Sequence, residues 1–291
     1  MKRRINPLLF IAFMITATAL FYSCQKDVSK STDIPAGQSK LSVYLTDGPY
    51  DFQQVLIDVK GIMVKVDTCE HNQNWGNGFY PGCDDHHDSL EKSCEYWDTL
   101  DVNPGVYDLL TLRNGVDTLL ASGFVLNGKI ERIKLVLGDN NSIMVDSVVH
   151  PLKLVNNWNF VFVNIGRDHL DSLSSNNFQL YLDFNLSRSI VYFGGNYWLL
   201  PVLKPFGKHS TGEIEGKIRP VHSYGTVYAF NDTDTSYARP FSQGEFKIRG
   251  LKEGTYSLFI NGANGYRDTT ITGIEVRRGR DTKLGTIQLT Q

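Results

Sequence analysis

Short runs in which apolar and polar residues alternate place the strongest constraint on the fold of this 291-residue chain. In residues 41–46, Leu and Val alternate with Ser, Tyr and Thr, and the turn-forming Asp47-Gly48-Pro49 then ends the run. Alternation with a period of two puts every second side chain on one face of a β-strand, which can then be buried. The same alternation recurs at residues 55–59, 133–137, 159–165 and 179–186. We therefore expect an all-β protein whose antiparallel strands are joined by tight turns.

The run between residues 55 and 66 changes its phase at Gly61. Apolar residues occupy the odd positions before this glycine and the even positions after it. A phase change at a glycine inside a strand predicts a β-bulge, because a bulge adds one residue to one of two paired strands. Helices are expected only within residues 88–97 and 108–120.

The length and the spacing of strands indicate two domains. One domain usually has about 150 residues. The small polar segment 207–212 interrupts the pattern, and beyond it short strands recur every 8–13 residues, as in small sandwiches. We expect two tandem antiparallel β-sandwiches of the Ig-like or prealbumin-like kind, at residues 39–206 and 213–291, joined by the linker 207–212.

The N-terminus has the features of an export signal. Three basic residues at positions 2–4 precede an apolar run that ends at Leu20, too short for the ~20 residues that span a membrane. The following Phe21-Tyr22-Ser23-Cys24 completes a segment that resembles a bacterial lipobox. This pattern predicts a signal peptide at residues 1–23 and acylation of Cys24. The alternatives are a secreted protein cleaved near Ser23 and a retained signal anchor.

Acylation of Cys24 determines the expected location. Several acyl chains on one cysteine anchor a protein stably to a membrane, whereas one chain binds weakly. We expect a bacterial cell-envelope lipoprotein attached to the outer membrane, on its periplasmic face or at the cell surface. The polar residues 24–38 would form a flexible tether. A formal charge of −2 without a basic stripe argues against nucleic acid as a partner.

Several short motifs follow one another in the order of a known family. They are Leu45–Pro49, Tyr107–Leu110 with Asn114-Gly115, Ile133–Leu135, Leu182–Phe184 with Ser189-Ile190, and Leu203–Pro205. Together they resemble the bacterial lipoprotein domain called "domain of unknown function 4382", over about residues 39–206. The insertion at residues 68–100 departs from the family, whose members are often shorter there. The resemblance implies a fold and a cell-envelope setting, and it implies no activity.

The C-terminal part has a second resemblance. Gly244–Ile248, Gly250-Leu251 and Gly254–Leu258 resemble the carboxypeptidase regulatory-like module, which has a transthyretin-like (prealbumin-like), carbohydrate-binding-like sandwich fold. The resemblance implies a module without a peptidase site. It also implies that Phe246 and Ile248 belong to the core and that Tyr256 packs near the start of a strand.

Residues 67–98 are unusually rich in cysteine and histidine. Since an exported chain meets an oxidising compartment, Cys69, Cys83 and Cys94 predict one disulfide of unknown pairing and one remaining thiol. The alternative is a zinc site built from Cys83, His86 or His87 and one more ligand, although no Cys-x-x-Cys spacing is present. No other cofactor is expected.

The same segment contains Trp75, Phe79 and Tyr80 among Gly and Asn residues. Exposed aromatic rings on a loop suit recognition of a glycan or a peptide, because a rigid ring buries apolar area at a low entropic cost. Their alternative role is to form the small core of the loop itself.

The sequence lacks four common catalytic or nucleotide-binding motifs. These are Gly-x-Ser-x-Gly, His-Glu-x-x-His, Gly-x-x-x-x-Gly-Lys-Ser/Thr and Gly-x-Gly-x-x-Gly. We therefore expect a non-catalytic binding or scaffolding protein of the cell envelope, whose ligand is a glycan or another envelope protein. The alternatives are a metal-binding function of the segment 67–98 and an accessory role in polysaccharide processing.

Overall fold

The computed structural model describes residues 33–48, 52–69 and 94–291. The chain separates into two units, Met1–Asp33 and Ile34–Gln291, and the second is compact. Strands dominate the described residues, which confirms the prediction of an all-β protein. The described helices are short: η1 (Leu109–Leu112), η2 (Val155–Asn157), η3 (Arg167–His169) and α2 (Leu186–Ser189). No described helix has the length and apolar character needed to cross a bilayer.

Two sheets are formed by the residues before position 207. The first contains, in order, β11 (Leu170–Ser174), β12 (Asn177–Asn185), β1 (Gln38–Gly48), β6 (Thr118–Leu126) and β4 (Asp101–Val102), and β15 (Leu203–Phe206) also pairs with β12. The second contains β10 (Phe160–Asn164), β7 (Lys129–Leu137), β2 (Gln54–Asp67), β8 (Ser142–Val145), β9 (Val148–Leu154), β14 (Asn196–Leu199) and β13 (Ile190–Phe193). Two further strands, β3 (Glu95–Thr99) and β5 (Gly105–Asp108), pair with β2.

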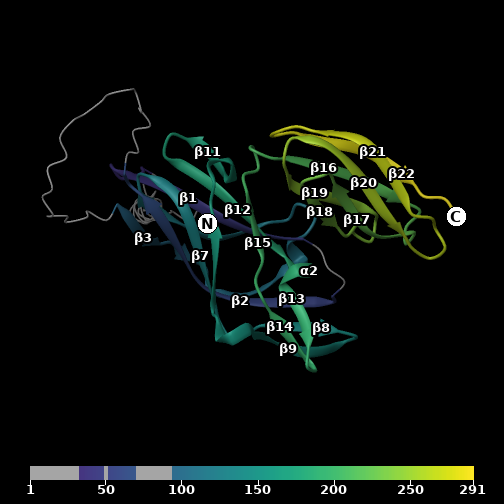
Figure 1. The fold of residues 1–291 in the computed structure, drawn as a ribbon, viewed down its shortest axis with the longest axis horizontal. Coiled ribbons are helices and arrows are strands. Elements are labelled where there is room, and N and C mark those ends of the chain that lie inside the picture. The colour runs from purple at the N-terminus through teal and green to yellow at the C-terminus, as the bar shows by residue number, and fades with distance from the viewer. Residues whose placement is uncertain (1–32, 49–51, 70–93) are drawn as a thin grey trace, which may run out of the picture. The chain divides into compact units, whose positions relative to one another are not determined.

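Two smaller sheets follow. One contains β19 (Glu245–Leu251), β16 (Gly212–Arg219) and β22 (Asp281–Gln288). The other contains β18 (Thr235–Ala238), β17 (Tyr224–Phe230), β20 (Gly254–Gly262) and β21 (Thr269–Val276). Figure 1 shows these seven strands, coloured green to yellow, gathered in one group.

Each pair of sheets encloses its own hydrophobic core. The first core draws buried residues from Leu41 to Leu199, and the second draws them from Ile214 to Leu289. Phe246, Ile248 and Tyr256 are all buried in the second core, as the alternation along β19 and β20 requires. Two cores with separate sheets give the layered arrangement of β-sandwiches.

The predicted bulge is present. The register between β2 and β7 shifts between Val59 and Gly61, and Val59 and Ile62 are both buried on the core side of the strand. The extra residue lets the inward face pass from odd to even positions without exposing the core.

Two expectations about local structure need correction. Not every pair of strands is antiparallel, because β1–β12, β9–β14 and β16–β22 are parallel. A long connection can bring back a strand in either direction, and the alternation pattern does not report that direction. The helix expected within residues 108–120 is only the four-residue η1, capped by Asp108, and the described end of the segment 88–97 belongs to strand β3.

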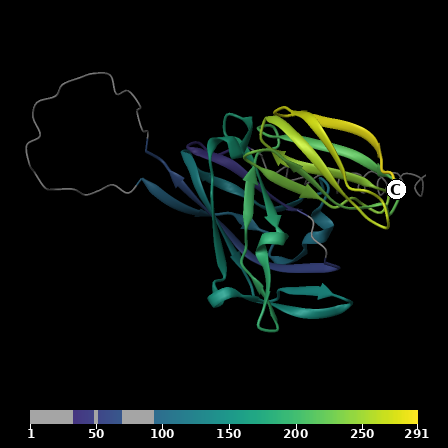
Figure 2. The ribbon, with the colours of Figure 1, turned by 45° about the vertical axis from the view of Figure 1, so that its right-hand side comes forward.

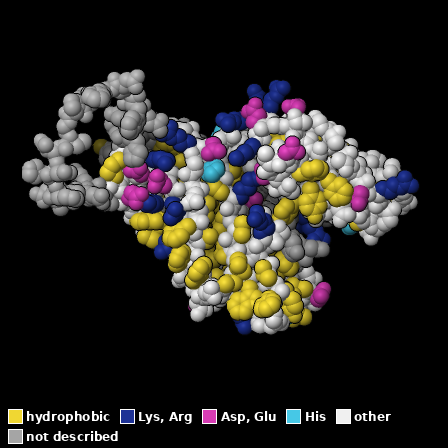
Figure 3. All heavy atoms as spheres, in the orientation of Figure 1, with side chains coloured by type: hydrophobic (Ala, Val, Ile, Leu, Met, Phe, Trp, Pro, Cys, Tyr) yellow, Lys and Arg dark blue, Asp and Glu magenta, His cyan; other side chains and the backbone are white. Residues whose placement is uncertain are grey.

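Two neighbouring hairpins, β8–β9 and β13–β14, are joined by the parallel pairing of β9 with β14, and they run side by side in both ribbon views (Figures 1 and 2). Their exposed side chains include Val149, Tyr192 and Phe193. Figure 3 shows hydrophobic side chains gathered over this part of the molecule, at its lower end.

Candidate functional site

Most residues predicted to form a site lie outside the described part of the chain. These are Cys24, Trp75, Phe79, Tyr80, Cys83, His86 and His87. The remaining two residues, Cys69 and Cys94, form a disulfide, and their Cα atoms lie 5.4 Å apart. Within the described ranges no cluster of three or more His, Cys, Asp or Glu residues could hold a metal ion. The zinc alternative, which depends on Cys83, His86 and His87, stays a prediction.

The structure instead reveals an open pocket on the outer face of the sheet β19–β16–β22. Along β16, Glu215 and Lys217 alternate with the buried Ile214 and Ile218, so the charged pair faces away from the core. The pocket has a volume of about 460 Å³, and Asn114, Phe241 and Lys283 are also among its lining residues. This volume lies within the range of about 300–1,000 Å³ that is typical of small-molecule sites.

Ion pairs across the strands arrange the charged groups of the pocket. Strand register places Lys247 and Lys283 on either side of Glu215. The Lys283 Nζ lies 3.0 Å from one carboxylate oxygen of Glu215, and the Lys247 Nζ lies 2.9 Å from the other. In the next row, Lys217 pairs with Glu245. The pocket therefore presents alternating ammonium and carboxylate groups in fixed positions.

These pairs hold both glutamates in their ionised form. Hydrogen bonds from Lys247 and Lys283 lower the pKa of Glu215, and a hydrogen bond from Lys217 lowers the pKa of Glu245. Burial alone would lower the pKa of Lys247, but hydrogen bonds to Glu213 and Glu215 outweigh it and raise the pKa. A general acid needs a carboxyl group that is protonated near neutral pH, and neither glutamate meets that requirement.

Phe241 forms an aromatic wall of the pocket and is 36% exposed. Its position is fixed through its backbone: its carbonyl oxygen accepts hydrogen bonds from the Gly244 amide at 2.7 Å and from the Tyr224 hydroxyl at 3.1 Å. The guanidinium of Arg113 lies 5.4 Å from the centroid of the ring. Cation–π contact of this kind is worth roughly 0.5–1 kcal/mol at an exposed site.

Asn114 connects the pocket to the turn that follows η1. Its side-chain amide donates to the Arg239 carbonyl at 2.9 Å, and its Oδ1 accepts from the Lys247 amide at 3.3 Å. Asn114 has a φ of 55°, a left-handed conformation that Asn adopts more readily than most residues. Both edges of its amide are therefore used to hold the rim of the pocket.

A second, much smaller hollow lies beside the first and also contacts Asn114 and Lys247. Its volume is about 30 Å³, and it is lined in part by Thr46, Asp47 and Asp183. Asp47 is only 5% exposed, and neither oxygen of its carboxylate has a hydrogen-bond partner. A hollow of this size admits a water molecule and excludes a sugar or a peptide.

The environment of Asp47 favours its protonated form. Burial raises the pKa of Asp47 well above its usual 3.8, and the negative charge of Asp183 raises it further, while the positive charge of Arg113 acts in the opposite direction. The adjacent Thr46 hydroxyl lies 3.0 Å from the Leu112 carbonyl and 3.1 Å from the Val116 carbonyl, which fixes the end of β1. Asp47 is therefore a buried carboxyl group with a raised pKa beside a hollow that is too small for a sugar or a peptide.

Sequence reasoning missed the pocket. The only local signal is the alternation of charge with apolar residues in Glu213–Lys217 and Glu245–Arg249, which identifies outward-facing groups. That signal does not show which strands are neighbours. The rows Lys283–Glu215–Lys247 and Lys217–Glu245 exist only because β19 and β22 pair with opposite edges of β16.

Comparison with solved structures finds several β proteins. One is a type II cohesin–X-dockerin complex from Acetivibrio cellulolyticus, with 25% identity over 27% of this chain and 56% of that chain and a TM-score of 0.23. This chain thus matches about half the length of that relative. Another is the minor pilin GBS52 from Streptococcus agalactiae, with 11% identity over 85% of this chain and 94% of that chain and a TM-score of 0.22.

A shaft pilin, spaA from Lactobacillus rhamnosus GG, has 9% identity over 87% of this chain and 98% of that chain, with a TM-score of 0.24. TM-scores this low support no argument about function. No curated protein matches the chain.

A family model gives the clearest relationship. It carries the description "Domain of unknown function (DUF4382)" and matches residues 38–201, which include the motif at residues 45–49. The match confirms the resemblance inferred from the sequence for the first domain, and the resemblance of residues 213–291 to a carboxypeptidase regulatory-like module stays a prediction. Since the match spans more than half of the chain, the protein belongs to the DUF4382 family.

Proposed function

We propose that the protein is a non-catalytic binding protein of the bacterial cell envelope and that it binds a neutral glycan in the pocket beside Phe241. The observation that carries this proposal is the combination of an aromatic wall with alternating ammonium and carboxylate groups in one open pocket of about 460 Å³. A sugar presents hydroxyl groups that both donate and accept hydrogen bonds. Lysine groups donate and carboxylates accept, so the pocket offers both partners.

The charge balance favours an uncharged ligand. Each of the lysines Lys217, Lys247 and Lys283 already has a carboxylate partner. A charged ligand would have to compete with these pairs, whereas hydroxyl groups can add to them. The C–H face of a pyranose ring would pack against Phe241, since an aromatic side chain provides a large, rigid apolar surface. The ionised state of Glu215 and Glu245 supports binding without hydrolysis.

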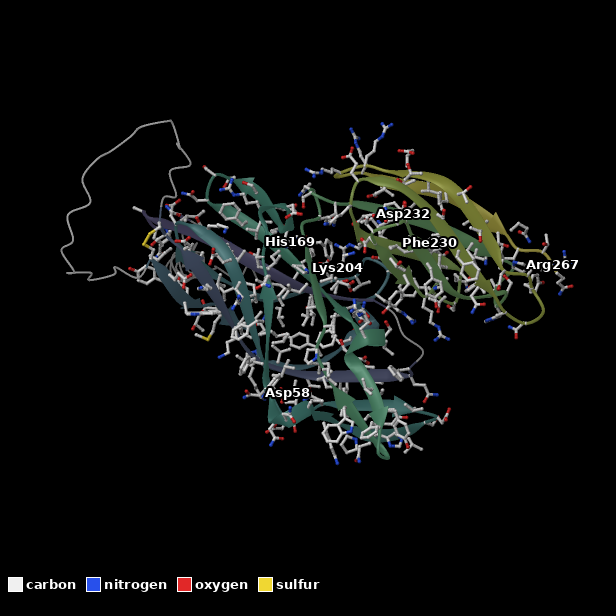
Figure 4. The ribbon with its side chains drawn as sticks, in the orientation of Figure 1. Asp58, His169, Lys204, Phe230, Asp232 and Arg267 are labelled. Carbon is white, nitrogen blue, oxygen red and sulfur yellow. A yellow bond between two sulfur atoms is a disulfide. The ribbon has the colours of Figure 1, made fainter. Side chains whose placement is uncertain are left out.

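The test is calorimetric titration of the full chain with neutral oligosaccharides chosen by screening a glycan array. We expect Phe241→Ala to weaken binding about tenfold, which corresponds to about 1.4 kcal/mol. The matched control is Phe230→Ala, because Phe230 (labelled in Figure 4) is 37% exposed and lies on β17, outside the pocket. Equal losses in the two variants, or no binding of any neutral glycan, would contradict the proposal.

Anchoring through Cys24 is part of the same proposal and is supported by the sequence of residues 1–24. Expression of the full chain with a radiolabelled fatty acid should label the protein, and Cys24→Ala should abolish the label. Fractionation of the envelope would then locate the protein in the outer membrane. An unlabelled wild-type protein would contradict acylation of Cys24, and its recovery from the medium or from the membrane would then separate simple secretion from a retained signal anchor. The lipid on Cys24 is the membrane contact that we propose.

A further inference from the structure

A second surface differs from the pocket in both shape and charge. It lies on the outer face of the sheet at β3, β7 and β10 and consists of Trp97, Arg132, Lys134, Phe160 and Phe162. We call it the aromatic–cation face. Figure 3 shows hydrophobic side chains beside Lys and Arg in the region of β3 and β7.

Strand register explains why these side chains share one face. Phe162 lies opposite Lys134, and Phe160 lies opposite Val136. Because every second residue of a strand faces the same side of the sheet, the two phenylalanines of β10 share one face with Lys134 of β7. The intervening residues Ile133 and Leu135 are fully buried. The three aromatic residues stay accessible: Trp97 is 39% exposed, Phe160 37% and Phe162 45%.

The rings and cations of this face form one connected cluster. The centroid of Phe162 lies 5.9 Å from that of Trp97 and 5.1 Å from that of Phe160. The Lys134 Nζ lies 4.5 Å from the Phe160 centroid and 6.0 Å from the Phe162 centroid. The Arg132 guanidinium lies 5.4 Å from the Phe162 centroid. Each cation is therefore held beside an apolar surface that a ligand can also contact.

The two cations of this face, Arg132 and Lys134, have no carboxylate partner among the described residues. The Arg132 Nε donates a hydrogen bond to the side-chain oxygen of Asn164 at 3.0 Å. The neighbouring Lys65 differs, since its Nζ lies 2.7 Å from Glu95 and 3.8 Å from Glu131. Two unpaired cations next to exposed rings are complementary to a ligand that is both anionic and partly apolar.

We infer that the aromatic–cation face binds an acidic polysaccharide, with a uronic acid unit placed against Phe160 and Phe162 and its carboxylate at Lys134 and Arg132. A uronic acid carries a carboxylate and an apolar C–H face on the same ring. This arrangement matches cations that lie 4.5–6.0 Å from ring centroids. An acidic peptide would need separate acidic and aromatic residues in a matching spacing. A flat sheet face also suits a polymer, which can bind without a deep pocket.

The inference is independent of the neutral-glycan pocket, because the two surfaces share no residue. Oligogalacturonate and its fully methyl-esterified form would be titrated against the full chain at low and high salt. We expect at least tenfold tighter binding of the acidic form, with an affinity that falls as salt rises. The double variant with Arg132→Gln and Lys134→Gln should lose at least tenfold, and Phe241→Ala should bind oligogalacturonate unchanged.

Lys153→Gln is the matched control, since the Lys153 Nζ also lies over an aromatic ring, that of Trp198, at 5.8 Å. It should bind oligogalacturonate as the wild type does. Three results would overturn the inference: equal affinity for the acidic and esterified forms, an equal loss in Lys153→Gln, or equally tight binding of polyglutamate, single-stranded DNA or phosphatidylglycerol vesicles. Circular dichroism of each variant would show that the fold is retained.

Discussion

The Arg249 Nη1 lies 3.2 Å from the Asp117 Oδ2, and the Arg249 Nε lies 3.1 Å from the Glu213 Oε1. The side chain of Arg249 is only 6% exposed, and its guanidinium lies 5.2 Å from the ring centroid of Tyr181 and 5.5 Å from that of Phe206. Asp117 lies just before β6, whereas Arg249 and Glu213 lie on β19 and β16. One buried guanidinium thus connects a strand of the first core to the sheet that carries the pocket.

Replacement of this arginine is expected to destabilise the protein strongly. Arg249→Ala leaves Asp117 and the buried Glu213 without a cation that they share, and loss of one partner from a buried ion pair costs about 3 kcal/mol. Urea unfolding would measure the change in the free energy of unfolding. Arg278→Ala is the control, because that side chain is 66% exposed and its Nε lies 3.9 Å from Glu253. If Arg249→Ala lowers the free energy of unfolding by less than about 0.5 kcal/mol, as expected for an exposed pair, the buried contact is not important for stability.

The raised pKa of Asp47 predicts a dependence of stability on pH. A carboxyl group whose pKa is raised by folding binds its proton more tightly in the folded state than in the unfolded chain. Its contribution to stability is complete below pH 3.8, the usual value, and is lost as the pH rises through the raised pKa. Asp47→Asn has a similar shape and cannot ionise, so it should match the wild type at low pH and exceed it in stability at higher pH.

Thermal unfolding of the wild type and of Asp47→Asn between pH 3 and pH 9 would test this prediction. Asp232→Asn is a suitable control, since Asp232 is exposed. A constant difference between Asp47→Asn and the wild type across the pH range would show that Asp47 does not change its protonation on folding.

Gly244 occupies a position that no other residue can fill without a shift of the backbone. Its φ is +84°, and a Cβ atom there would lie 2.3 Å from the Ile218 carbonyl oxygen. Gly244→Ala should therefore lose stability from both the left-handed conformation, about 1–2 kcal/mol, and the steric overlap. Gly265→Ala separates the two effects, because Gly265 has a φ of +85° with no atom within 4 Å. Denaturant unfolding should show the larger loss for Gly244→Ala, and equal losses would mean that the overlap is relieved at no cost.

The disulfide between Cys69 and Cys94 should contribute about 3 kcal/mol to the free energy of unfolding, because it restricts the unfolded chain. The two cysteines are 25 residues apart. The double variant with Cys69→Ser and Cys94→Ser should unfold at a lower urea concentration than the wild type, and dithiothreitol should lower the midpoint of the wild type alone. A wild-type midpoint that does not respond to the reductant, with the bond shown by mass spectrometry to be reduced, would contradict this prediction.

The sequence predicted those features that depend on neighbouring residues. The phase change at Gly61 identified the bulge, since a bulge follows from the local geometry of one strand. The core positions of Phe246 and Ile248 were implied by the resemblance of residues 244–258 to a known module, and both residues are buried. The alternation failed where direction or length mattered. It did not reveal that β1 and β12 are parallel, and it did not limit the helix after Asp108 to four residues.

The all-β character, the buried faces of the strands and the family motif at residues 45–49 were therefore determined by the sequence itself. The tertiary structure alone decided the sites. Glu215 forms ion pairs with Lys247 and Lys283, and Arg249 forms one with Asp117. Lys134 lies over the ring of Phe160. Each of these contacts depends on the packing of segments that are far apart in the chain. Register and neighbour order depend on long-range packing of whole sheets, and a local pattern contains no information about which strand lies beside which.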